Sequence, residues 1–164
     1  MVQRRTFLKA GVAGAALLLA GGTVSWLADR DAVADRREVL AAVIPAVLDG
    51  SLPQQASRRE GAVGQALTGV ETAIAALSPA AQQELAQLFA LMAIPPTRLA
   101  LAGLAHSWRD ATVAEVSSVL QAWRTHRLEL LQSAYHALHD LVVGSWYADQ
   151  AQWPGIGYDG PPRL

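Results

Sequence analysis

Apolar residues recur every three or four positions over most of the chain between residues 35 and 147, which is the spacing of the buried face of amphipathic helices. Ala and Leu dominate, whereas Ile, Thr and Tyr are sparse, and this composition favours helices over strands. Because the chain has 164 residues, one small domain is expected. The sequence therefore predicts an all-α fold, a bundle of about four to six helices over residues 35–148.

Turn-forming residues divide this pattern into helices. The first predicted helix covers residues 35–48, and Pro45 is expected to kink it or divide it into two short pieces. A second helix is predicted over about residues 60–77. Ser78 followed by a proline is typical of a helix start, and it predicts a third helix over residues 79–94.

The second half of the bundle is expected to contain the longest apolar face. Residues 99–108, which follow a Pro-Pro pair, are predicted to form a short helix or turn on the core. Thr112 and Glu115 have the spacing of a capping box, which marks a helix start. The apolar face then continues over residues 113–147. The sequence leaves open whether this region is one helix or two helices with a break near residues 125–126.

The helical pattern stops after residue 148. Residues 149–164 contain three glycines, three prolines and two aromatic residues, and they are predicted to form an irregular tail. Large aromatic side chains are enriched in protein interfaces. The aromatic cluster here is therefore a candidate surface for a partner, and the alternative is that it caps the bundle's own core. Its members are Trp146, Tyr147, Trp153 and Tyr158.

The amino-terminal segment, residues 1–34, has the features of an export signal. The pair Arg4 and Arg5 is followed by Phe7, Leu8 and Lys9, and then by an uncharged run from residue 10 to residue 28. This order resembles a twin-arginine (Tat) signal, which directs a protein across the membrane already folded. The chain is therefore expected in the periplasm, where the Tat translocase would deliver it.

Two fates of this signal stay open. The triplet Ala-Val-Ala at residues 32–34 has the small-x-small form of a cleavage site, although charged residues 29–31 directly precede it. The uncharged run at residues 10–28 is just long enough to cross a bilayer if it is not removed. Cleavage is the first expectation, and an amino-terminally tethered form at the inner membrane is the alternative.

Charge and cysteine content exclude several classes of function. Beyond residue 34 the chain has nine Arg and no Lys against twelve Asp and Glu, a net charge of −3. Such a domain lacks the basic surface that nucleic acid requires, so no nucleic-acid partner is expected. The chain has no cysteine, which excludes disulfides, thiolate metal sites and cysteine nucleophiles.

Neither of two candidate sites for cofactor chemistry is convincing. His136 and His139 are three positions apart on a predicted helix, so they could share a face and bind a metal or haem iron, but a surface pair is the preferred interpretation. Residues 155–160 match G-x-G-x-x-G, yet the dinucleotide fingerprint needs a strand before it and a helix after it. No catalytic, cofactor-binding or metal-binding residue is therefore assigned.

Short motifs stand at both ends of the chain. Near the carboxyl end, residues 146–149 (Trp-Tyr-Ala-Asp) are followed by Trp153 and by residues 156–162 (Ile-Gly-Tyr-Asp-Gly-Pro-Pro). Near the start of the mature region, residues 40–53 contain an Ile-Pro and a Leu-Pro pair. With the twin-arginine leader, these motifs resemble the gluconate 2-dehydrogenase subunit 3 family. The middle of the chain, about residues 55–125, shows only common helical character.

This resemblance implies a non-catalytic small subunit of a three-part enzyme. In that family a large FAD-dependent flavoprotein of the glucose–methanol–choline type oxidises a sugar, sugar acid or alcohol, and a multihaem subunit with haem c accepts the electrons. The small subunit binds the large one, assists its maturation and supplies its Tat signal. The residues expected to contact the partner are Trp146, Tyr147, Trp153, Gly157, Tyr158, Gly160 and Pro161.

Two other functions stay open. One is a stand-alone exported redox or metal-binding protein that uses His136 and His139. The other is a periplasmic helical bundle that has no flavoprotein partner.

Overall fold

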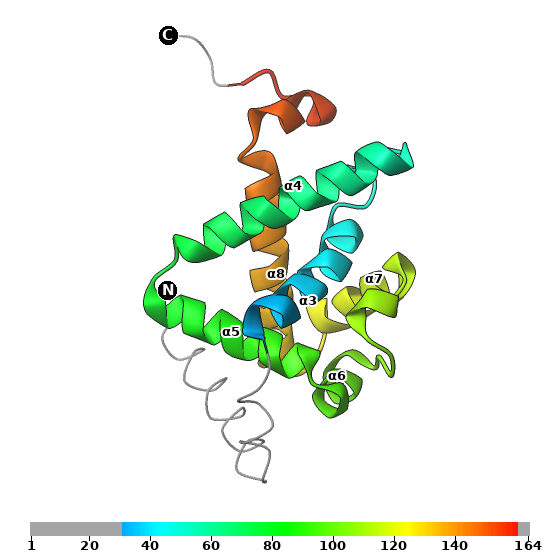
Figure 1. Cartoon of the computed structure of the whole chain (residues 1–164), viewed down its shortest axis with the longest axis vertical. Helices are drawn as coiled ribbons and strands as arrows, with labels where there is room; N and C mark the ends of the chain where they lie inside the picture. The colour runs from blue at the N-terminus through cyan, green and yellow to red at the C-terminus, as the bar shows by residue number, and fades with distance from the viewer. Residues whose placement is uncertain (1–30, 161–164) are drawn as a thin grey trace.

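The computed structural model describes residues 31–160 of the chain (Figure 1). The predicted export residues, from Arg4 to Lys9, and the predicted contact residue Pro161 lie outside this range. Within it the chain is all α-helical and has no strand, as predicted. The elements of the described range are α3 (Ala32–Val47), α4 (Ala56–Ala75), α5 (Pro79–Ala93), α6 (Pro95–Ala102), the 3-10 helix η1 (Trp108–Asp110), α7 (Val113–Arg124), α8 (Glu129–Tyr147) and the 3-10 helix η2 (Gln150–Ile156).

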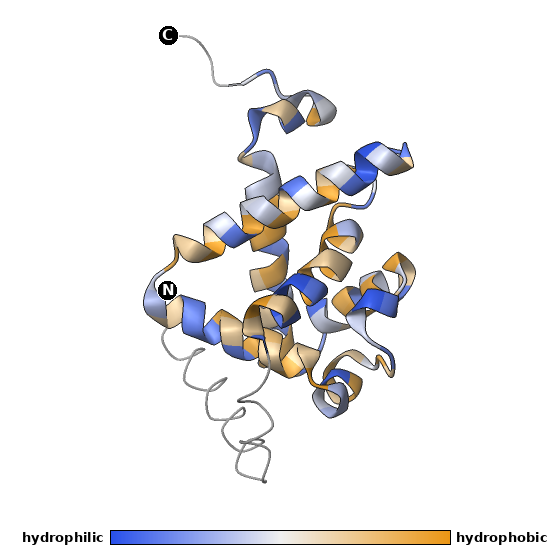
Figure 2. Ribbon diagram, viewed as in Figure 1, coloured by the Kyte–Doolittle hydropathy of each residue, from blue (hydrophilic) through white to orange (hydrophobic). Residues whose placement is uncertain are grey.

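Helix α3 lies at the centre of the bundle. In Figure 1 it is surrounded by α4, α5 and α7, with α8 behind it, and it packs against all four and against η1. Its buried face consists of aliphatic side chains at helical spacing that are all fully inaccessible to solvent: Val39, Leu40, Val43 and Ile44. Figure 2 shows both apolar and polar positions along each of the longer helices, as expected of amphipathic elements.

Of the two effects expected of Pro45, division of the first helix does not occur, because α3 is continuous from Ala32 to Val47. Pro45 lies in its last turn, where a missing N–H leaves only the carbonyl of Ala41 without its usual donor. Ala41 is exposed, so water can satisfy that carbonyl. The helix then ends with a bond from the N–H of Leu48 to the carbonyl of Ile44 (2.9 Å).

Helix α4 begins at Ala56, about one turn earlier than predicted, and crosses α8 closely. A Cβ atom placed on Gly69 would lie 3.4 Å from the Cβ of Ser145 on α8. This glycine therefore lets the two helices approach, although glycine lowers intrinsic helix stability. Tertiary packing holds α4, as its glycine-rich sequence requires.

Helices α5 and α6 form a corner. Ser78 caps α5 by accepting a bond from the N–H of Ala81 (3.3 Å), which confirms the predicted start. The Pro-Pro pair ends α5 and also starts the next helix, because α6 begins at Pro95. Within residues 31–160 no single helix is both long and apolar enough to cross a membrane; α5 and α6 meet that criterion only as a pair bent by 94°.

Buried polar groups tie this corner to the core. Arg98 is only 7% exposed, and it donates to the carbonyls of Leu104 (3.4 Å) and Ala93 (3.3 Å). A cation beside the carboxyl end of α5 also complements that helix dipole. Trp108 of η1 donates its indole N–H to the carbonyl of Met92 (2.7 Å), which connects η1 to α5.

The region 113–147 consists of two helices. Thr112 and Glu115 form the predicted capping box at the start of α7. The chain breaks after Arg124, close to the position at which the sequence suggested a break. The break is stabilised locally, because Nδ1 of His126 accepts a bond from the N–H of Leu128 (3.0 Å).

We predict that Leu40→Ala destabilises the fold by about 2–5 kcal/mol, because it leaves a cavity where a side chain is fully inaccessible to solvent. The neighbouring exposed substitution Ala41→Ser is the matched control and is expected to change stability by no more than about 0.5 kcal/mol. Urea unfolding followed by circular dichroism measures both. Equal losses for the two variants would contradict the central position of α3.

Candidate functional site

The aromatic cluster at the carboxyl end is divided between core and surface. Trp146 is 4% exposed and belongs to the hydrophobic core, so it offers almost no surface to a partner. Tyr147 is half-buried against that core, and its hydroxyl lies 3.4 Å from Oγ of Ser51. These two residues therefore pack mainly within the bundle, at the carboxyl end of α8.

The residues after them form a small folded unit, which we name the tail module (residues 149–160). Part of the predicted irregular tail is regular, because residues 150–156 form the 3-10 helix η2. Asp149 caps η2 by accepting a bond from the N–H of Ala151 (2.9 Å) and also accepts one from Nε2 of Gln65 on α4 (2.8 Å). Local capping thus overcomes the turn-forming composition.

Trp153 is the centre of the tail module. Its indole N–H donates to the carbonyl of Tyr147 (2.9 Å), which ties the module to the end of α8. The ring of Tyr158 lies edge-on to the ring of Trp153, with centroids 5.1 Å apart. The N–H of Tyr158 also donates to the carbonyl of Trp153 (3.1 Å). The module is therefore held both by its own Trp153–Tyr158 contact and by hydrogen bonds to the bundle.

Two glycines of the carboxyl-terminal motif have defined roles in this geometry. Gly157 has φ +71°, a left-handed conformation that ends η2 and turns the chain so that Tyr158 can return over Trp153. Gly160 has φ +98°, and a Cβ atom there would lie 3.4 Å from the ring of Trp153. The G-x-G-x-x-G spacing thus serves an aromatic turn.

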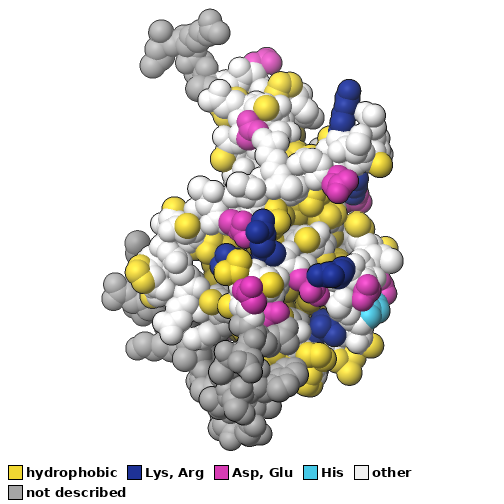
Figure 3. Space-filling model, in the orientation of Figure 1, with side chains coloured by type: hydrophobic (Ala, Val, Ile, Leu, Met, Phe, Trp, Pro, Cys, Tyr) yellow, Lys and Arg dark blue, Asp and Glu magenta, His cyan; other side chains and the backbone are white. Residues whose placement is uncertain are grey.

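The tail module projects from the bundle and keeps apolar surface exposed. Figure 1 shows it beyond α4, at the end of α8, and Figure 3 shows apolar atoms on its surface. Ile156 is 57% exposed and Tyr158 is 45% exposed. Sequence reasoning missed Ile156, although its position between the two glycines of the turn was a signal that its side chain would lie at the tip.

The histidine pair lies on α8. His136 is exposed and His139 is half-buried, and both rings lie beside Tyr135, with centroids 5.2 and 5.6 Å from its ring. Nδ1 of His139 is 3.2 Å from a carboxylate oxygen of Asp140. Among residues 31–160 no group of three or more His, Cys, Asp or Glu side chains has the arrangement of a metal site.

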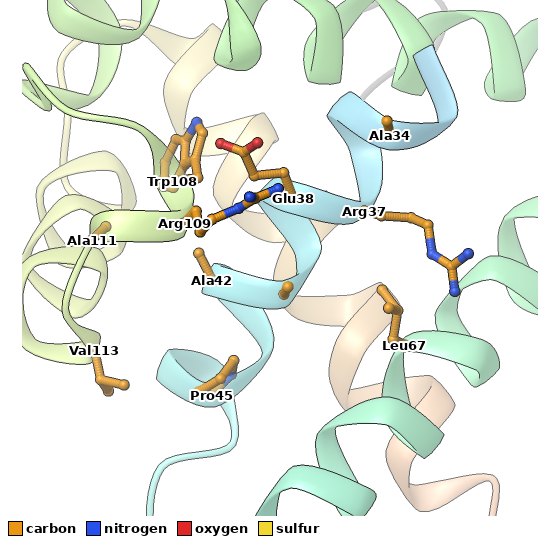
Figure 4. A pocket seen from close by; sticks show the side chains of 11 residues that line it. Ala34, Arg37, Glu38, Ala42, Pro45, Leu67, Trp108, Arg109, Ala111 and Val113 are labelled. Carbon is orange, nitrogen blue, oxygen red and sulfur yellow. The ribbon is translucent and has the colours of Figure 1, made fainter. Parts of the chain in front are cut away.

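An open groove of about 520 Å³ lies along α3, between α4 and η1 (Figure 4). Figure 4 shows Glu38 and Arg109 turned toward one another, while Arg37 points toward α4. Nε of Arg37 lies 3.5 Å from a carboxylate oxygen of Glu71. The lining contains no Ser, Thr, Tyr or His: Ala34, Arg37, Glu38, Ala41, Ala42, Pro45, Leu67, Trp108, Arg109, Ala111 and Val113. It therefore offers an apolar surface with charged edges but no nucleophile.

The capping box of α7 carries the strongest electrostatic perturbation among the described residues. Glu115 accepts bonds from the backbone N–H and the hydroxyl of Thr112 (2.8 and 2.7 Å), and these bonds lower the pKa of its carboxyl from 4.5 to about 2. His106 contacts the carbonyl of Ser107 (3.1 Å) and the carboxylate of Glu115 (3.2 Å), and both raise the pKa of its ring above 6.5. This arrangement connects the loop before η1 to the start of α7.

Comparisons with known proteins add no relative. No protein-family model, no curated protein and no solved structure matches this chain. A functional interpretation therefore depends on the residues and their geometry.

We predict that Glu115→Gln lowers the pKa of His106, measured by NMR titration of its ring. Gln keeps the capping box but removes the negative charge, while the Ser107 carbonyl remains in place. In the unchanged protein the raised pKa means that the bond to protonated His106 stabilises the fold below about pH 6.5, and this contribution is lost as the pH rises through the folded-state pKa. Asp140→Asn on α8 is the control, and an unaltered His106 titration in Glu115→Gln would contradict the pairing.

Proposed function

We propose that this chain is the non-catalytic small subunit of a periplasmic FAD-dependent dehydrogenase complex that oxidises a sugar, sugar acid or alcohol. The observation that carries the proposal is the tail module, an ordered unit that presents Ile156 and Tyr158 to solvent beyond the bundle. The motif from residue 153 to residue 160 that resembles the family is the motif that builds this unit.

The geometry of the tail module suits the binding of a protein partner. Exposed aromatic and aliphatic side chains supply apolar contact area whose burial favours binding. Trp153 and Tyr158 are already held in contact, and Trp153 is bonded to the end of α8. A preorganised surface loses less conformational entropy on binding, so more of the contact energy appears as affinity. In this proposal the large flavoprotein covers the module.

The cofactors of the complex belong to the partner chains in this proposal. FAD is held by the large subunit, and haem c by the cytochrome subunit that accepts the electrons. A flavoprotein must fold around FAD before export, which suits the Tat route. The pair Arg4 and Arg5 then serves the whole complex, and the small subunit assists maturation by holding its partner during export.

We predict that Ile156→Ser weakens co-purification with the flavoprotein without lowering the stability of the bundle. The matched control is Leu99→Ser, which changes a similarly exposed aliphatic side chain (54% against 57%) on α6. Pull-down of the flavoprotein with the tagged small subunit measures binding. Equal binding by both variants would place the partner elsewhere.

Truncation after Ala148 extends this test. The shortened chain is expected to remain helical and exported but to lose the flavoprotein, because the core residue Trp146 is retained and the tail module is removed. Circular dichroism and fractionation follow folding and export. A truncated chain that does not fold would instead assign the module to the stability of the bundle.

We predict that changing both Arg4 and Arg5 to Lys leaves the flavoprotein in the cytoplasm. The twin-arginine pair is the part of the signal that the Tat translocase recognises, and lysine keeps the charge. Dehydrogenase activity and flavoprotein antigen in periplasmic fractions measure the result. Normal export of the flavoprotein by the double variant would refute the carrier role, and a purified small subunit that contains metal or haem would support the histidine alternative.

A further inference from the structure

The triplet expected as a signal-cleavage site is part of the folded domain. Residues 32–34 form the first turn of α3, which begins at Ala32. Oδ1 of Asp31 accepts bonds from the N–H groups of Val33 (2.9 Å) and Ala34 (3.1 Å). The carbonyl of Asp31 accepts a further bond from the N–H of Asp35 (2.9 Å). The peptide bond between Ala34 and Asp35 therefore lies inside a capped helical turn.

The residues directly after that bond hold the helix in place. Arg36 and Arg37 both contact a carboxylate oxygen of Glu71 on α4, at 3.8 and 3.5 Å. Val39 and Leu40 follow and are fully buried in the core. Proteolysis concentrates at exposed loops and termini, because the cleaved segment must be free of its hydrogen bonds. Here the first turn of α3 would have to unwind before the peptide bond between Ala34 and Asp35 became accessible to the peptidase.

Cleavage at this position would also leave the helix with a poorer start. It would remove the capping carboxylate of Asp31 and place a new α-ammonium group on Asp35. The amino end of a helix carries partial positive charge, which anions stabilise and cations do not. The new positive charge would lie beside Arg36 and Arg37 as well.

We infer that the signal is not cleaved at residues 32–34 and that the chain keeps its leader as a membrane anchor. The inference rests on the proposed function in one respect: a Tat passenger crosses folded, so signal peptidase meets α3 already formed. The uncharged run from residue 10 to residue 28 is, by its length in residues, just enough to cross the hydrocarbon core of a bilayer. In this inference residues 10–28 lie in the lipid bilayer.

The spacing between the run and the bundle gives the anchor a geometric consequence. Only residues 29–31 separate the uncharged run from α3. Three residues reach at most about 10 Å, so an anchored chain would keep the start of α3 close to the membrane. In Figure 1 the tail module lies beyond α4, on the other side from the start of α3, so the flavoprotein would dock away from the anchor.

The full chain, expressed without the flavoprotein in a Tat-competent bacterium, tests the inference. The exported protein is expected to retain residues 1–34 by intact mass, to resist alkaline carbonate extraction and to require detergent for release. A mature amino terminus at Asp35, a terminus anywhere within residues 10–34, or a soluble periplasmic protein would overturn it. A chain that stays in the cytoplasm overturns it too, because the inference requires folded export.

Two pairs of variants test whether the folded turn or the local sequence prevents cleavage by signal peptidase. Asp31→Ala removes the cap and is expected to increase the cleaved fraction several-fold, whereas Asp31→Asn removes the charge but keeps a good cap and should stay uncleaved. A short Gly-Ser linker inserted between Ala34 and Asp35 should allow cleavage after Ala34 and release the bundle. The same linker inserted after Gly50, in the turn that follows α3, should not. An uncleaved Ala34 linker variant would show that the sequence, not the helix, blocks the peptidase, and would overturn the inference.

The anchor and the proposed function fail in different ways. Loss of flavoprotein binding by a chain that keeps its leader and stays in the membrane would refute the proposed function alone. A terminus at Asp35 together with normal flavoprotein export would refute the anchor alone.

Discussion

The burial of α3 is the constraint on which the rest of the structure depends. Four aliphatic side chains of this helix, from Val39 to Ile44, are completely inaccessible to solvent, and α4, α5, α7, α8 and η1 all pack around it. Burial of this kind supplies most of the free energy that opposes chain entropy in a small domain. Helix α3 is the first element of the described range, and Asp31 caps its amino end.

The tail module follows a different principle. It is small and lies at the end of α8. It is tied to the bundle by hydrogen bonds from Trp153 to Tyr147 and from Gln65 to Asp149, and its own Trp153 and Tyr158 rings are in contact. The bundle does not need to cover it, so Ile156 and Tyr158 remain available. In the proposed function, this projecting apolar unit is the surface that the partner chain covers. The open groove along α3 has an apolar lining with charged edges, but nothing in its geometry identifies an occupant.

Local signals in the sequence were good guides to the fold. Ser78 and the pair Thr112 and Glu115 start α5 and α7 as predicted, because a cap depends only on residues within one turn. Pro45 does not divide α3, because its cost depends on its distance from the helix end and on the exposure of the carbonyl it leaves free. The tail is more regular than its composition suggests. Its glycines and prolines exclude a long helix, but a capped 3-10 turn around Trp153 can include them.

The sequence by itself determined the helical class, the main capping positions and the aromatic and glycine residues of the carboxyl end, because each of these follows from short-range spacing and backbone preference. Only the tertiary structure decided which aromatic residues face the core: Trp146 is buried by packing against other helices, whereas Tyr158 is held at the surface by the turn at Gly157. It also decided that residues 32–34 belong to α3 and not to a free linker. Burial is a property of contacts between segments that are distant in the sequence, and periodicity along one segment does not contain it.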